Sequence, residues 1–413
     1  MKPATAMKSR VWALACAMAF ATTCPAAQAQ RKFEVMYSFM GGADGSTPSG
    51  FLLLAGNYVI GTTAAGGTYN SGTVFRLSQS APYKETVLYT FGSNPTGDGI
   101  SPSGTLVQDK AENVYGTTDE GGDPSCGSCG TVWKLDPSGK ETILHNFTGA
   151  PDGENPNGGL VRDNGGNLYG TTVTGGDSKC LEGGSSGCGT VFKIDTKGKY
   201  SVLHRFHGQV TDDGAIPGYG ALVLSGGWLY GTTTLGGRHQ AGTIFKVNAK
   251  NGAADVVYSF DPFGKKGGDG SIPLGGLLLD GSVFYGTTSQ GGSSGWGTVF
   301  KLEGDTETVL YNFTGMTDGG YPQSSLIKRP GHPFLYGTTY YGGIISDCPP
   351  YGCGLSFWLT PDGKDEFVDH KFTDLDGENP WAGLTLNKYG TIFYGTTTNG
   401  GGQGYGVVFR LHP

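Results

Sequence analysis

The chain has 413 residues, of which 76 are glycine, 37% are hydrophobic, 12% are aromatic and only 15% are charged. The apolar and aromatic content excludes a disordered polypeptide, and a formal net charge of −7 with no basic stripe argues against a nucleic-acid partner. Many short strand-like runs joined by glycine-rich turns predict an all-β protein.

The first 29 residues read as a secretory signal. Lys2, Lys8 and Arg10 precede an apolar run from Val11 to Ala21, which is too short to span a bilayer. Small residues at 27–29 then offer a cleavage site. We therefore expect a mature chain that begins near Gln30, is exported to the periplasm or the extracellular space, and contains no transmembrane segment.

The rest of the chain is built on one tetrad, Tyr-Gly-Thr-Thr, which occurs seven times with Ile replacing Tyr in the first copy. Its spacing runs from 51 residues (Gly286 to Gly337) to 61 residues (Gly170 to Gly231). A repeat of this length is one supersecondary unit, which buries its apolar face by stacking on its neighbours. The seven tetrad glycines are Gly61, Gly116, Gly170, Gly231, Gly286, Gly337 and Gly395.

One unit, from Asn157 to Phe206, shows the expected strands. They cover residues 159–163, 168–172, 189–194 and 200–206, and glycine- or lysine-rich turns or a longer loop separate them. Four antiparallel strands per unit and seven units predict a seven-bladed β-propeller occupying residues 30–413 as a single domain.

The two ends of the chain support this prediction. Residues 33–39 match only the fourth strand of a unit, and the last unit stops after residues 406–411, a third strand. The N-terminal strand should therefore complete the last blade, which closes the ring and leaves no exposed edge at the seam.

Every link between blades carries an Asp followed four residues later by Pro. The carboxylates could form a collar for a cation or polar ligand around the central mouth. The favoured interpretation is structural, because Asp-Gly makes a local turn and Pro fixes the entry into the next strand. The seven residues are Asp44, Asp98, Asp152, Asp213, Asp269, Asp318 and Asp376.

The combined pattern Tyr-Gly-Thr-Thr-x-x-Gly-Gly, Gly-Thr-Val-Phe-Lys-Leu and Asp-Gly-x-x-Pro resembles the tandem repeat called GloVer, found in exported bacterial proteins. It covers nearly the whole mature chain. The resemblance implies export and a propeller, and it implies no settled activity. A more distant likeness to kelch blades adds support for the fold only.

A candidate catalytic set lies in loops on one face of the propeller. His239 and Arg238 interrupt the repeat pattern, Tyr219 belongs to the same unit, and His207 lies in the link before it. Such groups could neutralise a carboxylate and move a proton in β-elimination of a uronate polysaccharide. The competing interpretation is a surface loop that merely contains an Arg and a His. Paired acids for glycoside hydrolysis, Asp152 with Glu154 and Asp376 with Glu378, are less evident.

Aromatic residues concentrate on the same face, mostly in blades 5 to 7 and blade 1. Flat rings beside carboxylates and amides suit sugar faces, although large rings could also simply cover the mouth. The candidate ligand-binding residues are Tyr69, Trp296, Tyr321, Tyr340, Tyr341, Trp381 and Tyr405, and Tyr351 is expected beside them.

Six cysteines remain after removal of the signal, and they pair locally in the loops of blades 2, 3 and 6. In an exported protein these pairs predict disulfides rather than a zinc site, because the pairs belong to separate blades. The expected pairs are Cys126 with Cys129, Cys180 with Cys188, and Cys348 with Cys353. The sequence predicts neither a metal nor a cofactor.

These observations favour an exported propeller whose loop face binds an extended ligand, with carbohydrate the first choice. The alternatives are a polysaccharide-active enzyme, a lyase rather than a hydrolase, and a protein-interaction scaffold that could bind other surface proteins.

Overall fold

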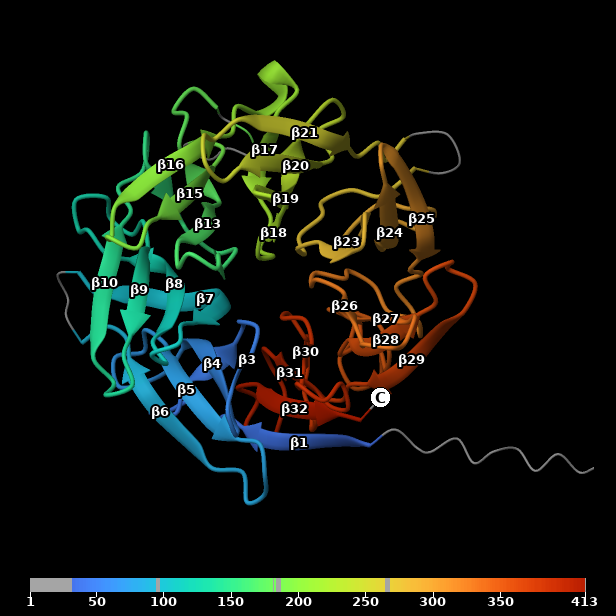
Figure 1. The fold of residues 1–413 in the computed structure, drawn as a ribbon. Helices are drawn as coiled ribbons and strands as arrows, with labels where there is room; N and C mark the ends of the chain where they lie inside the picture. The colour runs from blue at the N-terminus through green and yellow to red at the C-terminus, as the bar shows by residue number, and fades with distance from the viewer. Residues whose placement is uncertain (1–31, 94–96, 181, 183–186, 264–267, 413) are drawn as a thin grey trace, which may run out of the picture. The chain divides into compact units, whose positions relative to one another are not determined.

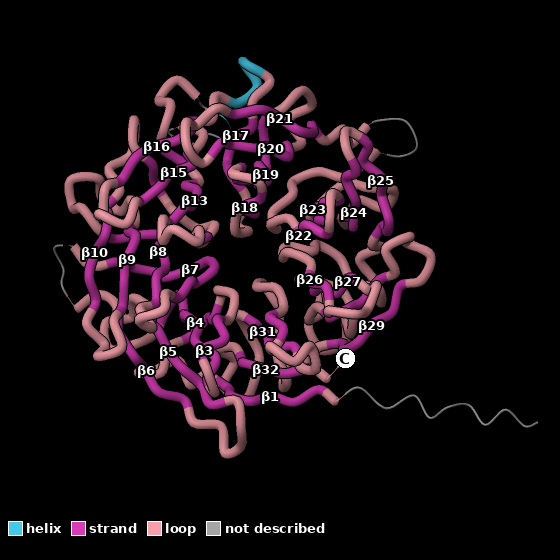
Figure 2. The backbone as a smooth tube through the Cα atoms, in the orientation of Figure 1, coloured by secondary structure: helices cyan, strands magenta, loops and turns pink. Residues whose placement is uncertain are grey.

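The computed structural model describes residues 32–93, 97–180, 182, 187–263 and 268–412, and the predicted signal at 1–29 lies outside them. Residues 32–413 form one compact unit. Seven small antiparallel sheets are arranged in a ring around a central axis, as the propeller prediction requires (Figure 1). Strands and loops make up nearly all of the described chain, with one 3-10 turn, η2 (Gly208–Thr211), at the periphery (Figure 2).

Each blade has four strand positions, numbered from the axis outward. Blade 1 contains β2 (Ser46–Pro48), β3 (Leu53–Ala55), β4 (Tyr58–Ala65), β5 (Thr73–Ser78) and β6 (Glu85–Thr90), and β2 and β3 both pair with β4. Blade 2 contains β7 (Gly99–Gln108), β8 (Val114–Gly121), β9 (Thr131–Leu135) and β10 (Glu141–Asn146). Blade 3 contains β12 (Leu160–Arg162), β13 (Leu168–Thr172), β15 (Thr190–Ile194) and β16 (Tyr200–Arg205), with a short extra pair, β11 (Gly153–Glu154) and β14 (Thr174–Gly175).

The remaining blades follow the same order. Blade 4 contains β17 (Gly214–Pro217), β18 (Val223–Ser225), β19 (Trp228–Gly236), β20 (Thr243–Asn248) and β21 (Ala254–Ser259). Blade 5 contains β22 (Leu278–Asp280), β23 (Val283–Thr288), β24 (Thr298–Glu303) and β25 (Thr306–Asn312). Blade 6 contains β26 (Ile327–Lys328), β27 (Leu335–Thr339), β28 (Leu355–Leu359) and β29 (Glu366–Lys371).

The predicted closure of the ring is confirmed. Blade 7 contains β30 (Thr385–Leu386), β31 (Phe393–Thr397) and β32 (Val407–Leu411), and its outer strand is β1 (Phe33–Ser38). The β1–β32 ladder runs antiparallel from the pair Phe33–Leu411 to the pair Ser38–Val407. Arg410 adds an ion pair across the seam, with its Nη2 2.7 Å from Oε2 of Glu34.

The residues of the repeat form the joints between blades. In each link the residue before Pro adopts a left-handed backbone, with φ between 54° and 58°. Its N–H donates a hydrogen bond of 2.8–3.0 Å to the carbonyl of a residue just before strand three of the preceding blade. The Pro packs on the glycine that follows that carbonyl, since a Cβ on Gly72 would lie 2.5 Å from Cδ of Pro102. The seven donor–acceptor pairs are Thr47–Tyr405, Ser101–Ser71, Asn155–Cys129, Ile216–Cys188, Ile272–Ala241, Tyr321–Trp296 and Asn379–Cys353.

The link aspartates lie beside the outer strands and not around the axis. A register shift in each outer strand turns a Tyr or His toward the Asp of the next link, which accepts its hydrogen bond. The Tyr37–Asp44 distance is 3.0 Å, and the His145–Asp152 distance is also 3.0 Å. The other pairs are Tyr89–Asp98, His204–Asp213, Tyr258–Asp269, Tyr311–Asp318 and His370–Asp376.

Candidate functional site

The joint geometry places two variable side chains next to each other on the loop face of every blade pair. One belongs to the left-handed residue of the link, and the other belongs to the residue whose carbonyl accepts its N–H. At the joint of blades 5 and 6 these residues are Tyr321 and Trp296, and the N–H of Tyr321 lies 2.9 Å from the Trp296 carbonyl oxygen. Their ring centroids are 5.4 Å apart. Trp296 also packs against the hydrophobic cluster between blades 5 and 6, so this joint anchors the ring that it places on the loop face.

From this joint a continuous series of ring contacts runs inward across blades 6 and 7. Tyr321 contacts Tyr341 at 5.5 Å, Tyr341 contacts Tyr340 at 4.8 Å, and Tyr340 contacts Trp381 at 5.7 Å between centroids. Tyr351 flanks the outer end, 5.1 Å from Tyr341 and 6.1 Å from Trp296. We call these residues the aromatic band: Trp296, Tyr321, Tyr340, Tyr341, Tyr351 and Trp381.

The inner end of the band reaches the axis. Trp381 of blade 7 contacts Tyr219 of blade 4, with ring centroids 5.7 Å apart. Both rings border a cavity of only ≈ 10 Å³ whose walls come from blades 1, 2, 3, 4, 6 and 7. Phe51 and Gln323 share this wall. These side chains fill the axial space at this level, so an extended ligand has to lie across the loop face and not through it.

Carboxyl groups lie near the band and affect the pKa values of its tyrosines and of Tyr219. Burial raises the pKa of Tyr341, and Tyr351, Tyr321 and Glu378 add to the shift. Burial also raises the pKa of Glu378, with a further contribution from Asp374. At the inner end, burial raises the pKa of Tyr219, and Asp119 adds to that shift.

Burial raises the pKa of Asp119 to about 6, and Glu120 adds to the effect. Asp119 directly follows a tetrad, and it is the only acidic residue at this position among the seven blades, which is the sequence signal that could have identified it. For Glu378 the sequence predicts only a role as one of the paired acids.

Two of the predicted ligand-binding aromatics lie outside the band. Tyr405 occupies the same joint position as Trp296, and its ring likewise covers a link glycine: an added Cβ would lie 2.5 Å from the Tyr405 ring at Gly41 and 2.2 Å from the Trp296 ring at Gly315. Tyr69 packs beside Gly92 in the next link. Both are exposed, at 45% and 54%. They border the loop face at blades 7 and 1.

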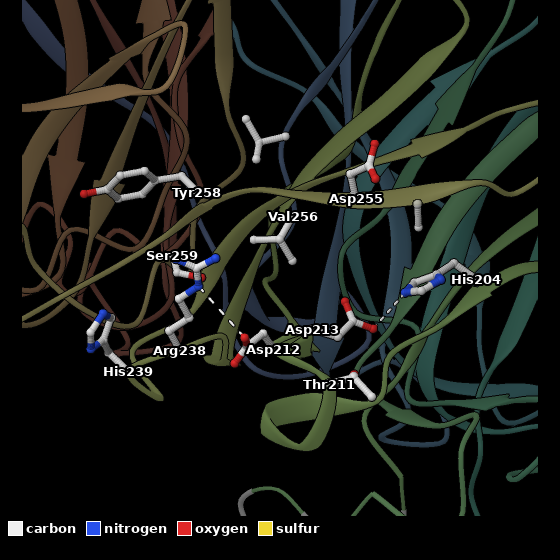
Figure 3. Close-up of a pocket in the computed structure, with 12 residues that line it drawn as sticks. His204, Thr211, Asp212, Asp213, Arg238, His239, Asp255, Val256, Tyr258 and Ser259 are labelled. Carbon is white, nitrogen blue, oxygen red and sulfur yellow. Dashed lines mark hydrogen bonds and ion pairs between the residues drawn. The ribbon is translucent and has the colours of Figure 1, made fainter.

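The predicted catalytic residues are not gathered at one point. Arg238 and His239 line an open depression of ≈ 620 Å³ along β21, together with Asp212 and His204 (Figure 3). The Nε atom of Arg238 lies 3.9 Å from Asp212, and both side chains are largely exposed, at 74% and 63%. The depression is at the rim, whereas Tyr219 faces the axial cavity.

His207 has a separate partner in blade 3. Its Nδ1 lies 2.7 Å from the Asp177 carboxylate, and the nearby His204 ring is 6.2 Å away between centroids. The paired acid Glu154 has its pKa raised by burial, whereas the neighbouring Asp152 is held by His145. In the described part of the chain, no group of three or more His, Cys, Asp and Glu side chains is arranged to hold a metal ion.

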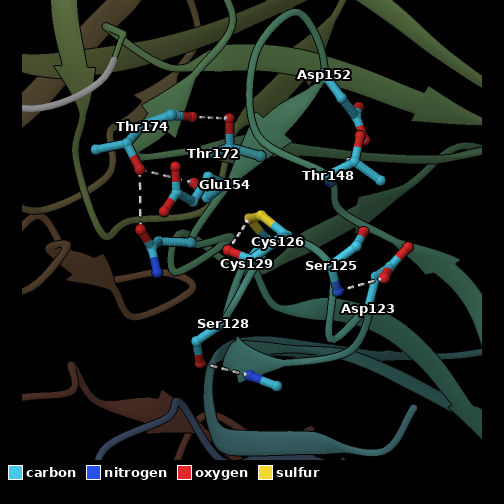
Figure 4. The surroundings of a disulfide bond; sticks show 12 residues. Asp123, Ser125, Cys126, Ser128, Cys129, Thr148, Asp152, Glu154, Thr172 and Thr174 are labelled. Atoms are coloured by element: carbon cyan, nitrogen blue, oxygen red, sulfur yellow. Dashed lines mark hydrogen bonds between the residues drawn. A yellow bond between two sulfur atoms is a disulfide. The ribbon is translucent and has the colours of Figure 1, made fainter. Parts of the chain in front are cut away.

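The three predicted disulfides are confirmed, with Cα separations of 5.8, 5.6 and 5.1 Å for the pairs 126–129, 180–188 and 348–353. In each pair the second cysteine supplies the carbonyl of a blade joint. Figure 4 shows the first bridge beside the link that carries Asp152, and a Cβ on Gly149 of this link would lie 3.7 Å from the Cys126 sulfur. Disulfides of this kind are typical of oxidising compartments.

None of the helices within the described ranges has the length and hydropathy needed to cross a bilayer.

Comparisons with solved structures give distant likenesses. A luciferin-regenerating enzyme is 12% identical, with 93% of this chain and 95% of that chain covered and a TM-score of 0.45. TolB from Acinetobacter baumannii is 14% identical, covering 76% and 62% with a TM-score of 0.43. A puromycin-hydrolysing peptidase of Mycobacterium tuberculosis is 14% identical, covering 88% and 52% with a TM-score of 0.49. Likenesses this weak say nothing about activity.

No curated protein matches the sequence. The Gloeobacter/Verrucomicrobia repeat matches it four times, over residues 23–182, 130–280, 180–348 and 262–413. These overlapping matches extend over nearly the whole chain and agree with the resemblance carried by the tetrads and the link motif. The chain belongs to the family of proteins built from the Gloeobacter/Verrucomicrobia repeat.

Proposed function

We propose that this protein binds an extended neutral carbohydrate along the aromatic band of its loop face. The observation that carries the proposal is the unbroken series of ring contacts from Trp296 at the rim to Trp381 at the axis. Aromatic rings present flat apolar faces to the C–H groups of sugars, and the tyrosine hydroxyls and nearby carboxyls can bond sugar hydroxyls.

The charges beside the band favour a neutral chain over a uronate. The charged groups that act on the band tyrosines are carboxyls, among them Glu378, and Asp119 acts on Tyr219 at the inner end. A polyuronate would place its own carboxylates next to these groups, and like charges in a partly desolvated site repel.

A uronate lyase is the less favoured alternative. Its chemistry needs a proton-transfer group and a carboxylate-neutralising cation at the same sugar. Arg238 and His239 share the rim depression, but Tyr219 lines the axial cavity and His207 bonds Asp177. In the described part of the chain, Tyr219 and His207 do not line the depression that holds Arg238 and His239.

We further propose that the protein acts outside the cytoplasm. The basic and apolar start of the sequence supports export, and the three local disulfides are consistent with it. Mass spectrometry of protein recovered from the periplasm or medium of an expressing bacterium should give a chain that begins near Gln30. An uncleaved chain in the cytoplasm would contradict export.

The binding proposal is tested on a panel of neutral and uronate oligosaccharides. Trp296→Ala and Tyr341→Ala should each weaken retention of a neutral oligosaccharide at least tenfold, which corresponds to about 1.4 kcal/mol. Tyr389→Ala is the matched control, because Tyr389 is 74% exposed in the turn between β30 and β31, away from the band.

Each contrary outcome has its own meaning. Equal losses in all three variants, or no saccharide retained by the wild type, would overturn the proposal. Release of unsaturated uronates, abolished by His239→Ala, would establish the lyase instead. Protein capture without any saccharide binding would indicate the interaction scaffold.

A further inference from the structure

The residue before the tetrad glycine occupies equivalent sites in all seven blades. It packs against an outer-strand residue of its own blade and against two residues of the next blade. Tyr169 clusters with Leu203, Leu229 and Val247, and the equivalent Tyr394 clusters with Met36, Val59 and Leu77. At the joint of blades 1 and 2 the same position is Ile60, which clusters with Leu88, Val114 and Leu135.

At the other six joints a phenol ring fills this space. Tyr169, Tyr336 and Tyr394 are only 2%, 1% and 1% exposed. The tyrosine hydroxyl reaches the polar rim of the site. The Tyr115 hydroxyl donates a hydrogen bond of 2.9 Å to Asp109, and the Tyr169 hydroxyl donates one of 3.0 Å to Asp163. The site is therefore shaped for a ring that is buried along its length and has one polar end.

Isoleucine leaves this space open. Its side chain branches at Cβ and ends well short of the para position of a tyrosine ring. A cavity of ≈ 360 Å³ lies here, with Ile60, Leu88, Val114 and Leu135 in its apolar wall. An apolar cavity of about 150 Å³ is already enough to bind benzene. The volume, the apolar wall and the polar rim thus correspond to an unfilled ring site.

A cation stands opposite the open position. In the β4–β5 ladder Ile60 pairs with Arg76, just as Tyr169 pairs with Lys193 in blade 3. The Lys193 ammonium lies 5.4 Å from the centroid of the Tyr169 ring. The Arg76 guanidinium lies 5.0 Å from the ring of Tyr58, at the edge of the cavity. A cation over a ring face favours electron-rich aromatics.

We propose that the cavity between blades 1 and 2 is a binding site for a small phenolic ring, which takes the place that tyrosine occupies at the other six joints. The ring enters between Leu88 and Val114, Arg76 covers its face, and its hydroxyl remains at the rim near Asn57 and Gln108. This site lies among the short turns between strands and is separate from the aromatic band.

The test uses 4-methylphenol, which matches the tyrosine side chain, and calorimetric titration of the purified protein. The wild type should bind one equivalent, and Ile60→Tyr should weaken binding at least tenfold because the new side chain fills the site. Ile60→Tyr restores the tetrad of the other six blades, so it should fold and should raise the unfolding temperature. Arg76→Gln should weaken binding about threefold to tenfold without filling the cavity.

Two comparisons distinguish binding at this site from non-specific binding of phenols. The non-planar analogue 4-methylcyclohexanol should bind at least tenfold more weakly than 4-methylphenol, because a cation–π contact requires a ring face. Trp296→Ala should leave phenol binding unchanged, which separates this site from the band. Equal phenol affinity in the wild type and Ile60→Tyr, or no binding to the wild type at millimolar phenol, would overturn the proposal.

Discussion

At the scale of single residues, the repeat motif is explained by steric and hydrogen-bonding demands of the blade. The tetrad glycine lies under the aromatic ring of strand three, and a Cβ on Gly395 would lie 2.4 Å from Cζ of Phe409. In blades 1 to 5 the second threonine of the tetrad bonds the threonine that begins strand three, as in the 2.9 Å contact between Thr172 and Thr190. These residues are committed to the fold, so function has to come from the positions that vary between blades.

The glycine constraint gives a direct prediction. Gly395→Ala should lower the free energy of unfolding by about 1–3 kcal/mol, because the added methyl group overpacks the Phe409 ring. Gly402→Ala is the matched control in the same blade, since a Cβ there would meet no atom within 4 Å. Denaturant unfolding measures both. A Gly395→Ala protein as stable as the control would show that the ring can move aside.

At the scale of the strands, the joints come in two chemical types. Where the outer strand presents Tyr to the link Asp, a Glu lies at the first or second position of the next outer strand. Where it presents His, the first residue of that next strand is Tyr200, Ala254 or Phe33. His145 stacks on Tyr200 at 3.6 Å and His370 stacks on Phe33 at 3.7 Å. At the Tyr-type joints the Glu is partly buried beside the link carboxylate, and both conditions disfavour its ionised form.

The pKa values follow this division. Burial and the adjacent link carboxylate raise the pKa of Glu307 to about 8. They raise the pKa to about 7 at the three equivalent joints, which carry Glu85, Glu141 and Glu366. In all four the Oε1 atom is buried and has no hydrogen-bond partner among the described residues. Such a site tolerates a protonated carboxyl better than an ionised one.

Stability should therefore decrease as the pH rises. Each raised pKa means that the folded state holds a proton that the unfolded state releases near pH 4.5, so the stabilisation is complete below that pH and is lost progressively up to about pH 8. Glu307→Gln removes this ionisation. It should stabilise the protein by about 1–3 kcal/mol at pH 9, a value reduced for partial solvation, and change little at pH 5.

Thermal unfolding across this pH range provides the measurement. Glu303→Gln is the control, because Glu303 is exposed at the end of the neighbouring strand β24. Glu303→Gln should leave the pH profile of the wild type unchanged. A Glu307→Gln profile parallel to that of the wild type would mean that Glu307 is ionised in the folded protein at neutral pH.

The sequence predicted the strands that local signals define, but it did not predict features that depend on contacts between blades. The strands at 168–172 and 190–194 were predictable, because alternation and turn residues are local signals. The register shift in the outer strands was not predictable, because it depends on a hydrogen bond to the Asp of the next link, which is a contact between blades. The separation of Tyr219 from Arg238 was missed for a similar reason. They are close in sequence, but Tyr219 lies in the bend between β17 and β18 beside the axial cavity, whereas Arg238 lies in a rim loop.

At the scale of the whole molecule, the joints make the propeller a circular chain of equivalent contacts. The seam between β1 and β32 repeats the Tyr–Asp bond, the left-handed link at Thr47 and the Pro–Gly contact found elsewhere, so it differs from the other blades only in covalent connection. The band extends over blades 5, 6 and 7 and across the two joints between them. Its residues can keep their alignment only while the ring stays closed.

Removal of β1 should therefore affect the entire protein. A chain that begins at Met40 lacks the partner of β32, exposing the edge of blade 7 and leaving Arg410 without Glu34. Open edges invite pairing with other chains, so this variant should elute as oligomers and unfold at a lower temperature than the chain 30–413. A peptide of residues 32–39 added in trans should restore the monomer, whereas a peptide with Val35→Pro should not, because proline cannot donate to the ladder. A stable monomer without β1 would show that six complete blades hold the seventh in place unaided.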